Sequence, residues 1–445
     1  MMICSDQFRT DFIGANGQNP NVKTPNLDAL VARGTNFRKA CCNQPLCSPS
    51  RASFLTGMYA TKTKVWKLGL ELDHSIPSIA TTLKTAGYST NFIGKWHVSG
   101  EGADKKIGRG WVPPGPSRAG FDYWEGANVL ELTSGPYGGN YWDNEGKDLN
   151  FSGEYRVDWM TGRVEQFLDR KQDKPWLCFF SILEPHQQNP RHPGDVEAMV
   201  PPKRYENSYN DPFVPQDLRD LPGNWQTHLP GYYGCVQAVD DSVGRIVKKL
   251  EQTGQLDNTI IVFFSDHGCH FHTRMGEYKR TPHDAALRVP LIFAGPGFDE
   301  SEVCDELVSL IDMTATLIDA TGTAVPSTMQ GKTLLPLVKD KAARKAWDNT
   351  VYYEISASMT ARGIRTKQWT YACYDPAASP NKDERGTNYI DYVLYDTGAD
   401  PYQKLNLVGR PEYKEICKEL REETRKRIVA NGEPDPKIAA QKYYF

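Results

Sequence analysis

Six polar residues follow four predicted strands, each close to the point where its strand ends. The apolar runs 1–5, 89–93, 176–183 and 260–265 have the length and composition of buried parallel strands. The residues that follow them are Asp6, Lys95, His97, His186, Asp266 and His267. In open α/β sheets the carboxyl ends of parallel strands lie along one edge, where ligands bind. We therefore expect these six side chains to share one site.

Two kinds of chemistry fit these residue types. Asp6, Asp266 and His267 would form an oxygen-rich set that favours a divalent cation such as Ca²⁺ or Mg²⁺ over softer metals. A tetrahedral anion would be surrounded by positively charged and imidazole donors. These donors are Arg51, Lys95, His97, His186 and Lys279.

A cysteine stands at the beginning of a predicted helix over 47–57, in the order Cys47-Ser48-Pro49-Ser50-Arg51. Pro49 suits the first turn, because its missing N–H has no partner to lose there. Free N–H groups and the helix dipole favour a thiolate or a bound anion at this end, and Arg51 adds a positive charge one turn along. A buried, inert thiol fits the same residues.

Helical patterns alternate with these strands as far as about residue 320, with helices expected at 24–34, 75–87, 155–170 and 236–254. This alternation predicts an α/β fold with a large, mostly parallel central sheet flanked by helices. Short strands at 351–356, 362–365, 369–374 and 392–395 precede a helix at 412–430. We expect a catalytic domain over 1–345 and a small C-terminal α+β subdomain with a short antiparallel sheet over 346–445.

Two segments, 99–153 and 187–230, are rich in proline, and the first is also rich in glycine and aromatic residues. We expect both to be long surface loops that carry binding function. Exposed aromatic side chains in loops suit sugar or aryl ligands, and the same residues also pack in ordinary cores.

The composition narrows the class of protein. The chain has 445 residues and a net charge of −3, which argues against a nucleic-acid or membrane-surface binder driven by bulk charge. No apolar run approaches the roughly 20 residues that span a bilayer. The ten cysteines show no paired CxxC spacing, so most are expected to be reduced and buried. No signal peptide is visible, which predicts a cytoplasmic location as written, or a periplasmic one if a leader was removed.

The ordered motifs of the chain resemble the formylglycine-dependent (type I) sulfatases of the alkaline-phosphatase superfamily. The resemblance includes Cys47-x-Pro49-x-Arg51 and spans nearly the whole chain. Further blocks in family order are Thr24-Pro25-Asn26-Leu27-Asp28, Gly94-Lys95-Trp96-His97, Pro185-His186, Ser265-Asp266-His267-Gly268, Arg288-Val289-Pro290-Leu291-Ile292 and Leu394-Tyr395-Asp396.

The resemblance implies hydrolysis of sulfate esters, with Cys47 oxidised to formylglycine by a maturation enzyme. The hydrated aldehyde would be held on a divalent cation, Ca²⁺ ahead of Mg²⁺ or Mn²⁺, and one of its oxygens would attack sulfur. His97 would remove the proton that lets the aldehyde re-form. The metal ligands carried over are Asp6, the modified Cys47, Asp266 and His267. The catalytic residues carried over are Cys47, Arg51, Lys95, His97, His186 and Lys279.

The chain departs from many family members at the metal ligands. Many have two adjacent aspartates after the first strand, where this chain has Ser5-Asp6, and many have Asp-Asn where it has Asp266-His267. Asp-His at this point is similar to choline sulfatases and phosphonate monoester hydrolases. Four residues are candidates to reach the substrate side of the pocket, although each also fits a loop residue bonded to backbone: His270, His272, Arg274 and His283.

The favoured substrate is a sulfated saccharide, with a small sulfate ester as the simpler possibility. A phosphonate monoester or phosphodiester hydrolase of the same superfamily needs the same anion site. A catalytically silent binding protein with this fold, and a protein that uses Cys47 as a free thiol, are the remaining alternatives. No nucleic-acid partner and no membrane span are expected.

Overall fold

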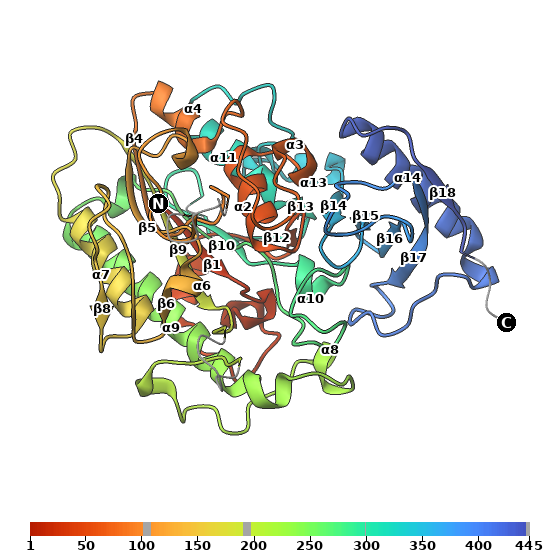
Figure 1. Ribbon diagram of the computed structural model, residues 1–445, viewed down its shortest axis with the longest axis horizontal. Helices are drawn as coiled ribbons and strands as arrows, with labels where there is room; N and C mark the ends of the chain where they lie inside the picture. The colour runs from red at the N-terminus through yellow and green to blue at the C-terminus, as the bar shows by residue number, and fades with distance from the viewer. Residues whose placement is uncertain (101–107, 190–196, 299, 442–445) are drawn as a thin grey trace.

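An eight-stranded sheet forms the centre of the protein (Figure 1). The structure is a computed structural model that describes residues 1–100, 108–189, 197–298 and 300–441. The strand order is β12-β2-β11-β10-β1-β9-β4-β5. The strands are β1 (Met2–Asp6), β2 (Gly34–Phe37), β4 (Ser89–Lys95), β5 (Tyr123–Ala127), β9 (Trp176–Pro185), β10 (Ile261–Ser265), β11 (Leu291–Ala294) and β12 (Glu302–Cys304).

Parallel pairing dominates this sheet. β1 lies between β9 and β10 and runs parallel to both, and β4 runs parallel to β9 and β5. Only the β11 pairings with β10 and β2 are antiparallel among the described strands of this sheet. The expected α/β fold with a mostly parallel sheet is therefore confirmed.

Helices cover both faces of the sheet (Figure 1). One face carries α1 (Pro25–Ala32), α7 (Arg156–Leu168) and α9 (Trp225–Gln252). The other carries α2 (Cys47–Thr56), α4 (Ile79–Thr85) and α11 (Leu310–Ala320). Shorter elements are β3 (Ala40–Cys41), α3 (Ala60–Thr63), α10 (Asp284–Leu287), β13 (Val308–Ser309), α12 (Leu335–Lys339) and α13 (Lys341–Ala346).

Aromatic packing fixes α2 against the centre of the sheet. The ring of Phe54 on α2 lies edge-on to Phe179 of β9 and to Phe264 of β10, with centroid distances of 5.8 and 5.0 Å. Each such pair contributes about 0.5–1.5 kcal/mol beyond the burial of its area. These contacts hold the first residue of α2, Cys47, near the carboxyl ends of the strands.

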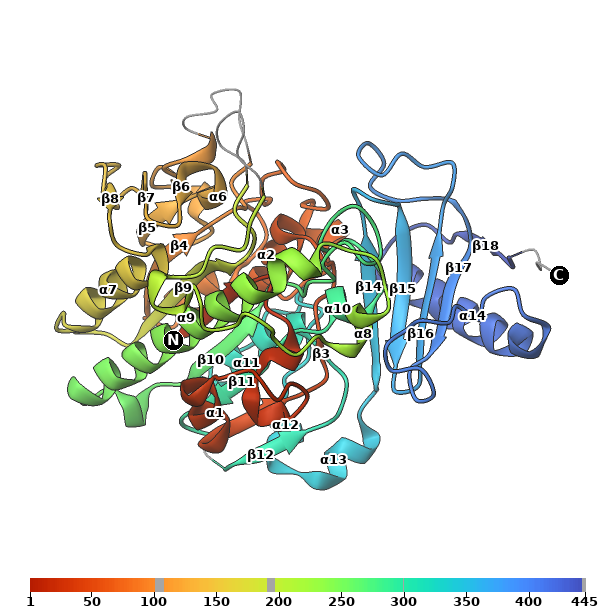
Figure 2. The same cartoon turned by 90° about the horizontal axis from the view of Figure 1, so that it is seen from below.

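A five-stranded sheet stands beside the larger body (Figure 2). It contains β14 (Thr350–Ile355), β15 (Ala361–Thr366), β16 (Trp369–Tyr374), β17 (Asn388–Asp396) and β18 (Lys437–Ala439), and α14 (Lys414–Ala430) packs along one face. The pairings from β14 to β17 are antiparallel, which confirms the small antiparallel sheet. Asn43 joins the two bodies, because its side chain donates to Tyr352 O at 3.0 Å and its carbonyl accepts from Glu354 N at 2.8 Å. The division at 345 and 346 stays a prediction.

Both segments expected to be loops contain regular structure. The first contributes β5 to the sheet and also forms α6 (Leu130–Thr133), β6 (Ser134–Gly135), β7 (Gly138–Gly139) and β8 (Phe151–Ser152). The second contains α8 (Gln216–Arg219) and the first turns of α9, which continues through Pro230. A proline inside a helix costs about 3 kcal/mol, and the long buried face of α9 offsets that cost. Residues 101–107 and 190–196 of these segments lie outside the described residues.

Two expectations from composition agree with the fold. In the described part of the chain, no helix is long and apolar enough to cross a membrane. All ten cysteines are free and buried.

Candidate active site

The carboxyl ends of four neighbouring strands meet at one edge of the large sheet. Asp6 is the last residue of β1 and Lys95 the last of β4, whereas His186 follows β9 and Asp266 follows β10. Ser5 of β1 pairs in register with Ser265 of β10, so Asp6 and Asp266 end neighbouring strands at the same level. The six predicted residues are all buried. The shared edge expected from the topology is therefore observed.

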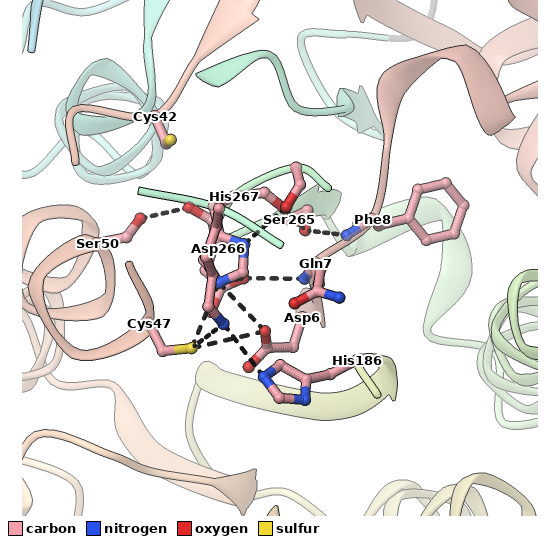
Figure 3. Close-up of polar contacts among 12 residues, drawn as sticks. Asp6, Gln7, Phe8, Cys42, Cys47, Ser50, His186, Ser265, Asp266 and His267 are labelled. Carbon is pink, nitrogen blue, oxygen red and sulfur yellow. Dashed lines mark hydrogen bonds and ion pairs between the residues drawn. The ribbon is translucent and has the colours of Figure 1, made fainter. Parts of the chain in front are cut away.

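Cys47 opens α2 directly beside these residues, and its side chain is only 2% exposed. Its Sγ atom accepts a hydrogen bond from Lys279 Nζ at 3.0 Å. The same Sγ atom lies 3.3 Å from His267 Nε2 (Figure 3). Ser50, one turn further along α2, donates from its hydroxyl to the carbonyl oxygen of Asp266 at 2.6 Å. This bond ties the beginning of the helix to the end of β10.

A set of four possible metal ligands surrounds one point. One donor atom from each of Asp6, Cys47, Asp266 and His267 lies within 4.8 Å of the other three. The Nδ1 atom of His267 is 2.9 Å from the carbonyl oxygen of Gly268. This contact assigns the proton to Nδ1 and leaves the lone pair of Nε2 facing the other three residues.

Asp6 and Asp266 each use one carboxylate oxygen to bind Arg51 and turn the other toward His267. Each Oδ2 atom accepts a hydrogen bond from Arg51 at 3.1 Å. Each Oδ1 atom faces His267 Nε2, at 3.4 Å for Asp6 and 3.6 Å for Asp266. One oxygen of each carboxylate is thus available, together with an imidazole and the side chain at position 47. This donor set fits a hard divalent cation.

Arg51 and Lys95 balance the negative charge from the protein side. The Arg51 guanidinium is fully buried and also donates to Lys95 O at 2.9 Å and to Ser181 Oγ at 2.7 Å. Lys95 Nζ lies 2.7 Å from Asp6 Oδ2. Because buried ions need both a counter-charge and hydrogen bonds, these contacts are what allow the two carboxylates to remain charged inside the protein.

The neighbouring charges determine how the buried groups ionise. Burial raises the pKa of the Cys47 thiol, but the ammonium groups of Lys279 and Lys95 outweigh burial and hold that pKa well below its usual value. Burial and Cys47 also oppose ionisation of Asp6, yet Lys95 and its other positive neighbours hold the Asp6 pKa below the usual range. The pKa of Asp266 is raised, by burial and by the Asp6 carboxylate. A cation between the two carboxylates would favour the charged form of both.

Lys279 and His186 approach Cys47 together. Lys279 Nζ lies 3.1 Å from His186 Nε2, and His186 Nδ1 lies 2.7 Å from the carbonyl oxygen of Gln187. The second contact assigns a proton to Nδ1, so the lone pair on Nε2 of His186 accepts a hydrogen bond from Lys279 Nζ. The pair thus holds a transferable proton beside Cys47.

One residue of this site escaped the sequence analysis. Glu131, on α6, has its Oε1 atom 3.0 Å from Lys95 Nζ and 3.6 Å from His97 Nδ1. It lies in the segment expected to be a surface loop. Residues 123–127, just before Glu131, include aromatic residues that favour a strand. That pattern was the sequence feature that could have indicated another strand end near Glu131.

His97 lies at the end of β4 with a backbone φ of 64°, in the left-handed region that side chains other than glycine adopt at a cost of about 1–3 kcal/mol. Ser5, the residue before Asp6, donates a hydrogen bond from its hydroxyl to Glu184 O at 2.7 Å. The single carboxylate at this point is therefore Asp6.

Two of the four residues predicted on the substrate side bond to backbone. His270 Nε2 lies 3.2 Å from the carbonyl oxygen of Lys279. Arg274 donates to the carbonyl oxygens of Tyr402 at 2.7 Å and Gln403 at 2.8 Å, in the C-terminal region. These contacts position the chain around Lys279, and a direct role in substrate binding stays a prediction.

The other two differ in exposure. His283 is buried, and its Nε2 atom lies 3.0 Å from the hydroxyl of Tyr395. His272 is partly exposed, and its ring centroid lies 4.3 Å from that of Tyr278, the neighbour of Lys279 in sequence. For both residues a role in substrate binding also remains a prediction.

This fold and this edge of the sheet define a hydrolase of the alkaline-phosphatase type. Residues 1–323 match the Sulfatase family, and residues 276–430 match the family described as N-sulphoglucosamine sulphohydrolase, C-terminal. The chain belongs to the sulfatase family, and it is a sulfuric ester hydrolase.

Relatives resemble the chain over nearly its full length. The Ulvan-active sulfatase of Formosa agariphila is 30% identical, over 100% of this chain and 83% of that protein. The N-acetylglucosamine-6-O-sulfatase of Bacteroides thetaiotaomicron is 25% identical, over 98% of this chain and 88% of that protein. The crystal structure of yidJ from Bacteroides fragilis superimposes with a TM-score of 0.81 at 25% identity, covering 97% of this chain and 96% of that one.

Proposed function

We propose that this protein hydrolyses sulfate esters of carbohydrates with a formylglycine derived from Cys47 and a divalent cation, Ca²⁺ ahead of Mg²⁺ or Mn²⁺. The observation that carries the proposal is the position of Cys47. Its Sγ atom lies 3.8 Å from Asp6 Oδ1, 3.3 Å from His267 Nε2 and 3.0 Å from Lys279 Nζ. An oxygen at this place would contact both a cation and the donors for a sulfate group.

The modified residue and a bound cation would together supply an oxygen nucleophile of lowered pKa. Asp6, Asp266 and His267 would hold the cation, and Arg51 fixes the orientation of both carboxylates. A maturation enzyme that oxidises Cys47 is the partner this chemistry requires.

The remaining residues move protons and neutralise charge. Lys279 contacts Cys47 and Lys95 contacts Asp6, so both ammonium groups would stabilise the negative charge that develops on the sulfate oxygens. The Lys279–His186 pair would pass its proton to the departing alcohol oxygen. His97 would remove the proton that restores the resting side chain at position 47.

Two relatives support a carbohydrate substrate. One is named for its activity on ulvan and the other for N-acetylglucosamine-6-O-sulfate.

The test is a substrate screen on enzyme of known modification state. The protein is produced with a formylglycine-generating enzyme, and peptide mass spectrometry measures the converted fraction of Cys47. Sulfate release is then measured on defined sulfated saccharides, on an aryl sulfate and on an aryl phosphonate monoester. Cys47→Ala is the matched control, and chelation followed by Ca²⁺, Mg²⁺ or Mn²⁺ identifies the cation.

The proposal predicts the highest kcat/KM on one sulfated saccharide and no turnover by Cys47→Ala. Faster cleavage of the phosphonate would instead establish the phosphonate hydrolase, which the Asp266-His267 pair also fits. Full conversion of Cys47 without turnover of any ester would indicate a silent binding protein.

A further inference from the structure

Glu131 lies beside Lys95 and His97, two residues to which the proposed function gives catalytic roles. β5 runs beside β4 with Ala127 opposite Lys95, and α6 begins three residues later at Leu130. Glu131 therefore follows β5 much as His97 follows β4. Its side chain is 8% exposed, and that of His97 is 5% exposed.

The contacts of Glu131 leave two neighbouring polar atoms without partners. Its Oε1 atom pairs with Lys95 Nζ at 3.0 Å. His97 Nδ1 lies 3.6 Å from that same oxygen, just beyond hydrogen-bonding distance. Within the described residues, neither His97 Nδ1 nor Glu131 Oε2 has a hydrogen-bond partner. A buried polar atom left unpaired costs about 1–3 kcal/mol, so a small rotation that joins these two groups is favourable.

We propose that Glu131 is a positioning residue that accepts a hydrogen bond from Nδ1–H of His97 and thereby keeps the basic lone pair on Nε2. This role rests on the proposed function, in which His97 removes a proton at position 47. A carboxylate that fixes the tautomer and the ring orientation of a histidine base is a recurring arrangement in hydrolases.

The charge and anchoring of Glu131 suit this role. Burial raises its pKa, but the positive surroundings, with the Lys95 ammonium as the main cause, outweigh burial and bring the Glu131 pKa to about 2. The side chain is therefore a carboxylate at neutral pH. Lys95 is itself held by Asp6, so one carboxylate oxygen of Glu131 is anchored and the other is available to His97.

Three variants separate positioning from simple charge balance. Glu131→Gln removes the charge and keeps the shape, and Glu131→Asp keeps the charge on a shorter side chain. Glu125→Gln is the matched control, because Glu125 is also a buried carboxylate, 1% exposed, but it lies on β5 and pairs with Arg163 at 2.6 Å. Thermal unfolding of each variant identifies any general loss of stability.

The first measurement is the ring nitrogen spectrum of ¹⁵N-histidine-labelled protein with unmodified Cys47. The chain has nine histidines, and the His97 signal is assigned by its loss in His97→Asn. Wild type is expected to show His97 protonated at Nδ1, and Glu131→Gln a change to the Nε2–H form or a mixture of the two. Because this spectrum needs no turnover, it tests the role of Glu131 even if the proposed reaction is wrong.

The second measurement is the kinetics of fully modified enzyme. Glu131→Gln is expected to lower kcat about 10²-fold, within the range that acid–base catalysis contributes. We expect KM to change little, Glu131→Asp to recover part of kcat, and Glu125→Gln to match wild type.

Either of two results would overturn the proposal. One is a wild-type His97 that carries its proton on Nε2. The other is a His97 tautomer unchanged in Glu131→Gln, whether or not kcat falls, since Glu131 would then act only on Lys95.

Discussion

Replacing Arg51 by methionine tests whether one guanidinium holds the two carboxylates of the proposed metal site. The substitution removes the charge and all the donors but keeps much of the length of the side chain. Asp6 keeps Lys95 as a partner at 2.7 Å. Within the described residues, Asp266 keeps only the backbone N–H of Gln7 as a hydrogen-bond donor to its carboxylate, at 3.2 Å. Asp266 therefore becomes a buried charge with little compensation.

The magnitude follows from the burial of the pair. All three side chains are fully buried, and removing one partner of a buried ion pair costs about 3–5 kcal/mol. A folded domain is stable by about 5–15 kcal/mol, so the loss is a large fraction of the total. We expect the free energy of unfolding to fall by about 3–5 kcal/mol and turnover to be lost with the metal site.

The assay is urea unfolding followed by tryptophan fluorescence, with turnover measured on the same preparations. Arg362→Met is the matched control, because Arg362 is 1% exposed and pairs with Glu433 at 2.8 Å in the C-terminal sheet. The control is expected to lose comparable stability and to keep its turnover. An Arg51→Met variant within about 1 kcal/mol of wild type, or one with wild-type turnover, would refute the reasoning.

Two further predictions concern a proton acceptor and a buried carboxyl. His97→Ala is expected to release one equivalent of alcohol product and then stall, because the proton that restores position 47 is not removed; rapid-quench kinetics without such a burst would contradict this role. Burial raises the pKa of Glu354 to about 7, so the folded state holds a proton there that the unfolded chain loses above about pH 4.3. The contribution of Glu354 to the free energy of unfolding therefore falls as the pH rises from about 4.3 to 7. The Tm of Glu354→Gln should therefore rise relative to that of wild type as the pH increases from 5 to 8. A difference in Tm that stays the same at every pH would contradict the raised pKa of Glu354.

Residues at strand ends could be predicted because topology alone places them. Four apolar runs in an alternating α/β pattern require parallel pairing, and parallel pairing brings Asp6, Lys95, His186 and Asp266 to one edge. The position of α2 could also be predicted from neighbouring residues, because Pro49 favours the first turn of a helix and a glycine ends it. The depth of burial of Cys47 was not predictable, because it depends on how α2 packs on the sheet.

Glu131 could not be predicted because its place depends on long-range pairing. Residues 123–127 form β5 only by lying beside β4, and the buried Glu125 within them is paired with Arg163 from α7. A charged residue and a glycine inside so short a run hide the strand signal. The contacts of Arg274 with Tyr402 and Gln403 could not be predicted from the sequence either, because more than a hundred residues separate the partners.

The first turns of α9 were missed for a local reason. Pro230 and the prolines before it predict loop, and the helix nevertheless begins at Trp225. Burial of residues from Leu229 to Leu250 along one face stabilises the helix enough to include the proline.

The most direct test of the account compares turnover with the state of Cys47. Preparations with different converted fractions are made by varying the supply of the formylglycine-generating enzyme, and intact-protein mass spectrometry measures each fraction. The account predicts that kcat per mole of protein is proportional to the converted fraction and extrapolates to zero when Cys47 is unmodified. Turnover that persists in fully unmodified protein, and that thiol alkylation abolishes, would contradict it and make Cys47 a working thiol.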